Sequence, residues 1–201
     1  MKRKQEDLSL LVDEVVKDNK KLRNVISLLY DSDMEKRFLG AKALGEIAKI
    51  RPELIKHRWG RIFYAFDDTM SCWGVAEGLG EIARNIPELR GKIVLLLRKF
   101  QKDESSLQGF IWAMCRIGQV EKNKIRNFIP ELISLLDSKD VYLLGQTIWA
   151  LGELKISGIT ERIKDLLEDN RQTRIFENNS VRSKSIREIA EEAMEKLKKG
   201  R

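Results

Sequence analysis

The segment LGEIAKIRPEL, at Leu44–Leu54, is repeated as LGEIARNIPEL at Leu79–Leu89, 35 residues further along the chain. Weaker copies follow, because RIGQV at Arg116–Val120 and ALGEL at Ala150–Leu154 resemble the first half and IPEL from Ile129 resembles the second. Each copy carries one glycine, and these glycines, spaced 34 to 38 residues apart, are Gly45, Gly80, Gly118 and Gly152. A fixed period of this length predicts an array of similar units that stack on one another.

Each unit is predicted to contain two helices joined by a short polar turn. In the first helix, apolar residues recur every three or four positions, an amphipathic spacing found over residues 22–30, 54–66, 89–100 and 128–136. Three of these helices begin near a proline followed by a glutamate, at Pro52, Pro87 and Pro130. Proline has no N–H to leave unpaired in the first turn, and the glutamate carboxylate faces the positive end of the helix dipole.

The second helices share a pattern of small and aliphatic residues. They read KRFLGAKALGEI (Lys36–Ile47), SCWGVAEGLGEI (Ser71–Ile82), GFIWAMCRIGQV (Gly109–Val120) and LLGQTIWALGEL (Leu143–Leu154). This pattern resembles the second helix of HEAT-type repeats, in which a small-residue face is followed by Ala-Leu-Gly and an aliphatic residue. Arg37 occupies the usual arginine position of that family, whereas the other three repeats have Cys72, Phe110 and Leu144 there.

The resemblance covers residues 20–158 and implies an architecture more specifically than an activity. HEAT-like arrays serve as scaffolds, enzyme subunits, lyase-associated proteins and, in a few cases, DNA glycosylases. We expect one HEAT-like repeat domain over residues 1–201. It would consist of an N-terminal capping helix at 1–21, four repeats at 22–158, and a variant C-terminal repeat with a hairpin insertion at 159–201.

A small β-hairpin is predicted inside the last unit. Asn178-Asn179 tolerates the positive φ angles of a tight turn and lies between the apolar residues of 174–176 and Val181. Ser185 and Glu188 then form a capping box, which predicts the start of a final amphipathic helix. The predicted fold class is therefore all-α, a right-handed α-α superhelix of about five HEAT-like helical pairs with a β-hairpin near the C-terminus.

The composition excludes several classes of protein. The 38 Lys and Arg residues outnumber the 31 Asp and Glu residues, and the resulting formal charge of +7 admits an anionic partner. Cys72 and Cys115 form no CxxC motif and His57 is the single histidine, so neither a disulfide framework nor a metal site is expected. No apolar run reaches the roughly 18 to 20 residues of a membrane span. We expect a cytoplasmic protein with no membrane contact.

Aligning the second helices on their glycines separates core positions from positions that face a partner. The residues one and four before and two after each glycine are all apolar and form the predicted core: Ala41, Leu44, Ile47, Ala76, Leu79, Ile82, Met114, Ile117, Val120, Ile148, Leu151 and Leu154. The residues three and seven before each glycine vary, and are predicted to face the concave surface: Phe38, Lys42, Trp73, Glu77, Ile111, Cys115, Gly145 and Trp149. Their large side chains, with Trp112 one position away, either fill gaps between neighbouring helices or line an open aromatic groove.

Two further columns, meaning sets of equivalent positions in the aligned second helices, carry charged residues. The residues one after the glycines are Glu46, Glu81, Gln119 and Glu153, and the cations four after them are Lys49, Arg84 and Lys122. One interpretation is an ion pair within each helix, with the cation at the negative helix end. The other is a ridge of cations that follows phosphates, although the acids in these columns argue against a strong nucleic-acid site.

These patterns favour a non-enzymatic scaffold or adaptor that binds a protein or peptide on its concave surface. No P-loop, GxGxxG, GxSxG or HExxH motif is present, so no catalytic residue and no cofactor is predicted. The predicted groove residues are Phe38, Lys42, Trp73, Glu77, Glu81, Arg84, Ile111, Trp112, Cys115 and Trp149.

The alternative is a nucleic-acid-binding HEAT-like protein. Trp73 and Glu77, four residues apart, are similar to the aromatic residue and carboxylate of HEAT-like alkylpurine DNA glycosylases, with Glu77 in place of the usual aspartate. Trp112 and Trp149 are further aromatic residues available from later repeats. Arg116, the nearest candidate for the partner arginine, is assigned to a different helix face.

Overall fold

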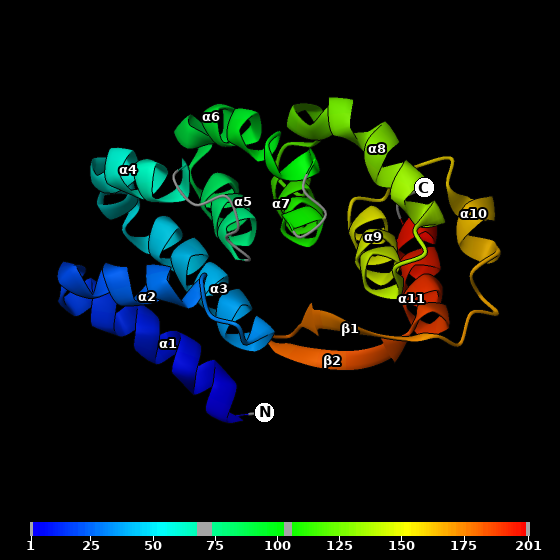
Figure 1. The fold of residues 1–201 in the computed structure, drawn as a ribbon, viewed down its shortest axis with the longest axis horizontal. Helices are drawn as coiled ribbons and strands as arrows, with labels where there is room; N and C mark the ends of the chain where they lie inside the picture. The colour runs from blue at the N-terminus through cyan, green and yellow to red at the C-terminus, as the bar shows by residue number, and fades with distance from the viewer. Residues whose placement is uncertain (1, 68–73, 103–105, 200–201) are drawn as a thin grey trace.

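The computed structural model describes residues 2–67, 74–102 and 106–199. Within these ranges, paired helices stack side by side into a curved array, and a two-stranded hairpin bridges its ends (Figure 1). The predicted all-α superhelix with a small hairpin near the C-terminus is thereby confirmed.

The two helices of each pair occupy different layers of the array. The first helices are α2 (Leu22–Leu28), α4 (Pro52–Asp67), α6 (Pro87–Leu97), α8 (Ile129–Ser134) and α10 (Thr160–Lys164). The second helices are α3 (Met34–Ile50), α5 (Val75–Asn85), α7 (Leu107–Gly118), α9 (Val141–Glu153) and α11 (Ile186–Lys198). An additional helix, α1 (Lys2–Lys17), packs against α3. In Figure 1, α4, α6, α8 and α10 form the outer rim, and α5, α7, α9 and α11 lie inside it.

Helix starts follow the capping residues in the sequence. The Asp33 carboxylate accepts hydrogen bonds from the backbone N–H groups at the start of α3, and Asp140 does the same for α9. Pro52 and Pro87 are the first residues of α4 and α6, as predicted. The Ser185 hydroxyl accepts from the Glu188 N–H at 3.2 Å, while a Glu188 carboxylate oxygen accepts from the Ser185 N–H at 2.7 Å. The predicted capping box is therefore present at the start of α11.

Replacing Ser185 with alanine should lower the free energy of unfolding by about 1 kcal/mol, because the Glu188 N–H loses its acceptor in the first turn of α11. Ser183→Ala is the matched control, since Ser183 is exposed on the same strand and caps no helix. The two variants should differ in urea unfolding midpoint by that amount. Equal midpoints would mean that the capping box contributes nothing to stability.

The repeat glycines allow neighbouring second helices to approach closely. A Cβ atom built on Gly80 of α5 would lie 2.5 Å from the Cα atom of Ala113 on α7. A Cβ on Gly152 of α9 would lie 2.9 Å from the Cα of Ala193 on α11. Because carbon atoms do not approach this closely without overlap, glycine at these positions determines the spacing between the helices.

The core follows the predicted apolar stripe with one exception. Eleven of its twelve residues are buried, and Val120 is 46% exposed. Helix α7 ends at Gly118, so Val120 lies beyond the last helical turn, where the helical spacing no longer directs it inward. The prediction for Val120 was wrong because the position of the helix end, and not the apolar pattern, decides its environment.

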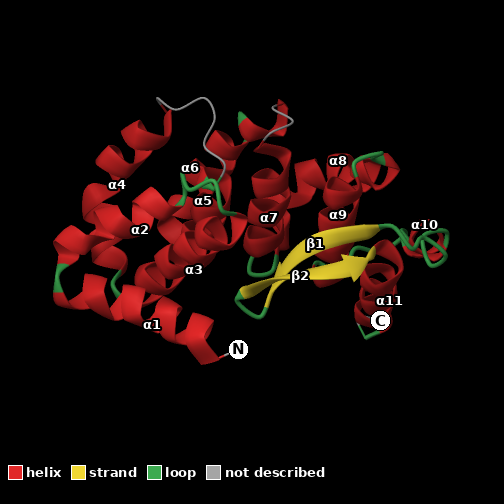
Figure 2. Cartoon of the chain, turned by 60° about the horizontal axis from the view of Figure 1, so that its bottom comes forward, coloured by secondary structure: helices red, strands yellow, loops and turns green. Residues whose placement is uncertain are grey.

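The hairpin consists of β1 (Gln172–Glu177) and β2 (Ser180–Ser185), paired antiparallel. Asn178 and Asn179 have φ angles of 49° and 59°, which suit a two-residue hairpin turn. The hairpin crosses the concave side of the array, from the start of α11 to the start of α3 (Figures 1 and 2). At its far end the Val181 N–H donates to Glu35 Oε1 at 3.3 Å.

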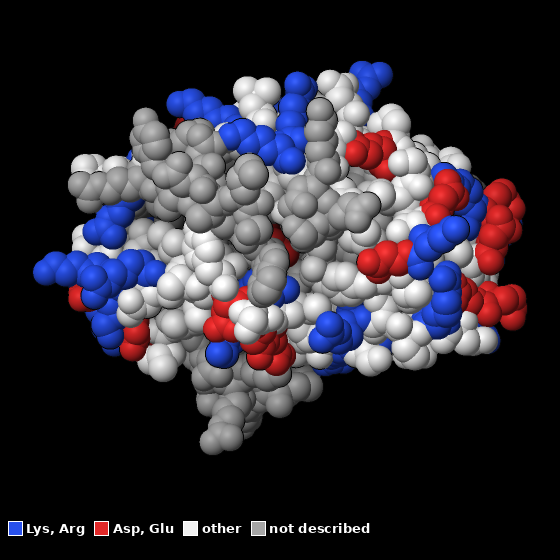
Figure 3. Space-filling model, in the orientation of Figure 1, with Lys and Arg blue, Asp and Glu red and all other residues white. Residues whose placement is uncertain are grey.

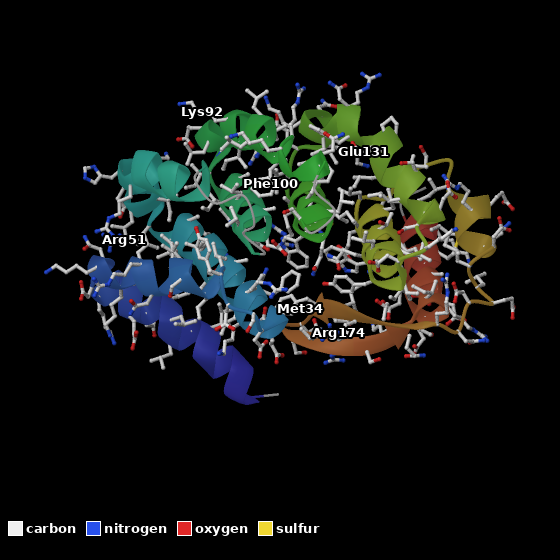
Figure 4. All side chains as sticks on the ribbon, in the orientation of Figure 1. Met34, Arg51, Lys92, Phe100, Glu131 and Arg174 are labelled. Atoms are coloured by element: carbon white, nitrogen blue, oxygen red, sulfur yellow. The ribbon has the colours of Figure 1, made fainter. Side chains whose placement is uncertain are left out.

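A second contact joins the two ends of the array. The Tyr142 hydroxyl, at the start of α9, donates to the Met34 sulfur of α3 across 3.5 Å. Arg174 of β1 lies beside Met34 at the edge of this junction (Figure 4), where both line a surface hollow with Arg37 and Val181. The first and fourth repeats therefore meet beneath the hairpin.

Candidate binding surface on the concave face

The predicted groove residues fall into two groups along the second helices. Trp73 lies outside the described residues. The others belong to α3 (Phe38, Lys42), α5 (Glu77, Glu81, Arg84), α7 (Ile111, Trp112, Cys115) and α9 (Trp149). Phe176 of the hairpin packs on Phe38 and Trp112 of the aromatic group. Lys42, Glu81 and Arg84 belong to a separate charged network.

The aromatic residues form one continuous stack with a side chain from the hairpin. Phe176 of β1 stacks on Phe38 with ring centroids 4.5 Å apart, and Phe38 meets the edge of Trp112 at 4.9 Å. Trp112 in turn stacks on Trp149 at 5.0 Å. All four rings are buried, with Trp149 the most exposed at 9%. We call Phe38, Trp112, Trp149 and Phe176 the aromatic stack.

Burial rules out an open aromatic groove at these positions and favours the gap-filling interpretation. Ile111 and Cys115 are also fully buried. Burial raises the pKa of the Cys115 thiol far above its usual range, so Cys115 has no reactive thiolate near neutral pH. Of the two interpretations left open by the sequence, the open aromatic groove is therefore wrong at these positions. Over Phe38 the cover is Phe176, more than 130 residues later in the chain. No repeat pattern encodes that contact.

Glu77 of α5 is buried against Gly109 of α7. It is 1% exposed, and a Cβ atom built on Gly109 of α7 would lie 2.4 Å from its Oε2 atom, which has no hydrogen-bond partner. Burial raises the pKa of this carboxyl to about 8, although Arg37 acts in the opposite direction. Glu77 is therefore protonated at neutral pH. The Gln146 side chain and the Thr173 hydroxyl are also buried without a hydrogen-bond partner.

This arrangement does not present a glycosylase-like site to solvent within the described residues. Glu77 is enclosed, and Trp112 and Trp149 stack on each other, which leaves no gap for a base between them. A protonated carboxyl also lacks the negative charge that would stabilise a cationic sugar.

The charged group forms a network across the second helices, which we call the charged strip: Lys42, Glu81, Arg84, Arg116, Gln119, Glu153 and Lys196. Its centre is the Glu81 carboxylate, which is almost fully buried. Glu81 accepts hydrogen bonds from Trp112 Nε1 and Arg116 Nη2, both at 3.2 Å. Lys42 Nζ lies 3.6 Å from the same carboxylate. Glu81 thus connects α3, α5 and α7.

Gln119 continues the charged strip toward the C-terminus. Its side-chain oxygen accepts hydrogen bonds from Arg84 Nη1 at 2.7 Å and from Arg116 Nη1 at 2.9 Å. Its side-chain nitrogen donates to Glu153 at 2.7 Å, and Lys196 Nζ lies 2.8 Å from Glu153. Contacts of the strip therefore extend from α3 to α11.

Two expectations for these columns are corrected. One of the two interpretations paired Glu81 with Arg84 within α5, but Arg84 donates to Gln119 of the next repeat and Glu81 pairs with Lys42 and Arg116. Arg116 was assigned to a different helix face, yet it lies in the strip, 5.6 Å from the Trp112 ring centroid. A long guanidinium side chain reaches across a helix face, so its helical position alone does not fix where its charge lies.

Positive charge is incompletely neutralised at the centre of the charged strip. Burial lowers the pKa of Lys42, and the guanidinium groups of Arg116 and Arg84 lower it further against the opposing effect of Glu81. Burial and Arg116 likewise lower the pKa of Arg84. Like charges therefore lie close enough to repel one another. Lys42 and Arg116 are recessed, with side chains 18% and 14% exposed.

Many charges elsewhere on the described surface form exposed pairs. Lys56 Nζ lies 2.6 Å from Glu88, and Arg162 Nη2 lies 2.5 Å from Asp137. Figure 3 shows basic side chains along the edge formed by α6, and intermixed acidic and basic side chains around α10. Exposed pairs of this kind contribute about 1 kcal/mol or less to stability, and water screens them. The recessed cations of the charged strip are screened less.

Residues 2–67, 74–102 and 106–199 contain neither a metal-binding cluster nor a helix that could span a membrane. No group of three or more His, Cys, Asp or Glu side chains there is arranged to hold a metal ion. No helix in the same residues is both long and apolar enough to cross a membrane.

No protein-family model matches the sequence, and no curated protein matches it. Solved structures do match the fold. An engineered protein aligns over 96% of this chain and 88% of its own, with 19% sequence identity and a TM-score of 0.51. A designed armadillo repeat protein in complex with the peptide (KR)4 aligns over 96% of this chain and 90% of its own, with 15% identity and a TM-score of 0.52. At these identities the likeness shows the fold alone, and the chain has a HEAT- and armadillo-like repeat fold.

Proposed function

We propose that the protein is a non-enzymatic scaffold or adaptor that binds a protein or peptide on its concave surface. The observation that carries the proposal is that this surface already holds an extended polypeptide segment, the chain's own hairpin. Phe176 inserts its ring against Phe38, and the Val181 backbone N–H donates to Glu35. An apolar anchor combined with a backbone hydrogen bond is how extended peptides are commonly bound.

The charged strip is the part of the concave surface that we assign to the partner. Phe38 and Trp149 were interpreted from the sequence as apolar groove residues, but Phe38 packs on Phe176 of the hairpin and Trp149 stacks on Trp112. Lys42 and Arg84 are proposed to give charge complementarity to the partner, whereas Glu81 is buried and does not face it. The designed armadillo repeat protein of similar fold is in complex with a peptide, which supports this use of the architecture but transfers no residue at 15% identity.

Selection of random peptides of about twelve residues against the purified protein tests the proposal. We expect enriched peptides to bind with micromolar dissociation constants in fluorescence anisotropy, and Arg84→Gln to weaken them. Lys92→Gln is the matched control, because it removes the same charge from an exposed position on α6 (Figure 4). The control should bind like the original protein.

Failure of the peptide selection would favour the alternative function, nucleic-acid binding. If no peptide is enriched and short DNA binds with an affinity that falls steeply as salt rises, the protein binds nucleic acid through phosphate contacts. The proposed function would then be wrong.

A further inference from the structure

Building on the proposed function, we propose that the charged strip recognises acidic side chains, so that the partner is a peptide segment containing Asp or Glu. The relevant surface comprises Lys42 on α3, Arg84 on α5 and Arg116 on α7. These three cations come from three successive repeats and surround one carboxylate, that of Glu81.

Glu81 cannot satisfy all three cations. Its carboxylate is buried and already contacts Trp112, Arg116 and Lys42. In the part of the chain that the structure describes, Arg84 forms no ion pair with a carboxylate, and its hydrogen bond goes to the neutral amide of Gln119. A guanidinium group has five N–H donors in a planar fork that matches a carboxylate. An incoming Asp or Glu would therefore give Arg84 the anionic partner that it lacks.

The environment strengthens such a contact. Lys42 and Arg116 are recessed, so water screens their charge less than that of a fully exposed lysine. Burial and mutual repulsion lower the pKa of both Lys42 and Arg84. A bound carboxylate would relieve that repulsion, whereas a basic peptide would increase it. The net charge of the preferred peptide is thus opposite in sign to that of the (KR)4 peptide in the designed armadillo complex.

The positive segment is short, and this favours a peptide over nucleic acid. Glu46 lies one turn after Lys42 on α3, and Glu153 lies at the other side on α9, near Arg84. A phosphate backbone that continued along the strip would meet these carboxylates, because its charges recur at every nucleotide. A peptide can instead place one or two acidic side chains at the centre and neutral residues beyond it.

The test uses three labelled peptides of about twelve residues that alternate serine with glutamate, glutamine or lysine. We expect the Glu-Ser peptide to bind in fluorescence anisotropy at about 0.1 M salt, and the other two to bind at least about tenfold more weakly. Arg84→Gln should weaken Glu-Ser binding about tenfold, with Arg84→Lys intermediate because it keeps the charge but loses the fork. Lys92→Gln should change it less than about twofold.

Several results would overturn the inference. If Arg84→Gln and Lys92→Gln weaken Glu-Ser binding equally, binding depends on the overall charge of the protein and not on the charged strip. If oligothymidylate binds more tightly than the Glu-Ser peptide and Arg84→Gln weakens that binding, the charged strip binds nucleic acid. If selected peptides are neutral or basic and Arg84→Gln weakens them, the acidic preference is wrong and the proposed function stands. Lys42→Gln provides a second test if Arg84→Gln fails to fold.

Discussion

Replacing Gly80 with alanine is expected to lower the free energy of unfolding by about 2 kcal/mol, because an overpacking cost of about 3 kcal/mol, at the upper end of the usual range, is partly offset by helix propensity. The added Cβ would lie 2.5 Å from the Cα and 2.8 Å from the Cβ of Ala113. The nearer atom belongs to the backbone, so no rotamer change removes the overlap and α5 must move away from α7. The higher helix propensity of alanine, about 1 kcal/mol, offsets only part of this cost.

Gly91→Ala is the matched control for Gly80→Ala. Gly91 lies in helix α6, is exposed, and has no heavy atom within 4 Å of a built Cβ. Alanine there should raise stability by about 0.5 to 1 kcal/mol through helix propensity alone. Urea unfolding of the two variants should therefore give shifts of opposite sign. If Gly80→Ala is also stabilised, the close approach of α5 and α7 is not a feature of the folded protein.

The repeat pattern predicted the architecture because it records contacts that every unit makes. Gly80 and Gly152 recur where second helices approach each other, and the apolar stripe recurs where they face the core. The turn at Asn178 and Asn179 was also predictable, since its conformation depends on neighbouring residues alone. Capping by Ser185 is local for the same reason.

The cover over the concave surface was not predictable from the repeats. Phe176 packs on Phe38, and Tyr142 contacts Met34, across separations that no local pattern encodes. The pairing of side chains within the charged strip could not be predicted from the sequence either. A glutamate at a repeat position lies near cations of its own helix and of both neighbouring helices, and the sequence does not choose among them. The neutral Gln119, in a column otherwise occupied by glutamate, was the one signal that the column bridges repeats.

The second large expected effect concerns pH and the Glu77 carboxyl. Burial raises its pKa in the folded protein from 4.5 to about 8. Below about pH 4.5 the carboxyl is protonated in both the folded and unfolded states, so it causes no pH dependence there. Between about pH 4.5 and 8 the unfolded chain releases this proton and the folded protein retains it, so stability must fall as pH rises. Above about pH 8 the carboxyl is ionised in both states, so stability falls no further.

Glu77→Gln removes this loss because the amide does not ionise. At about 1.4 kcal/mol per pKa unit, the free energy of unfolding of the variant should exceed that of the original protein by about 3 to 5 kcal/mol at pH 9. Near pH 4 the two free energies should be equal. Urea unfolding across this range measures the difference. Glu53→Gln is the control, since Glu53 is exposed and its hydrogen bond with Arg51 lowers its pKa, so its loss should give no gain at alkaline pH. If Glu77→Gln instead keeps the full decline in stability between pH 5 and 8, Glu77 is already ionised in the folded protein. A compensating cation must then reach it in the folded protein.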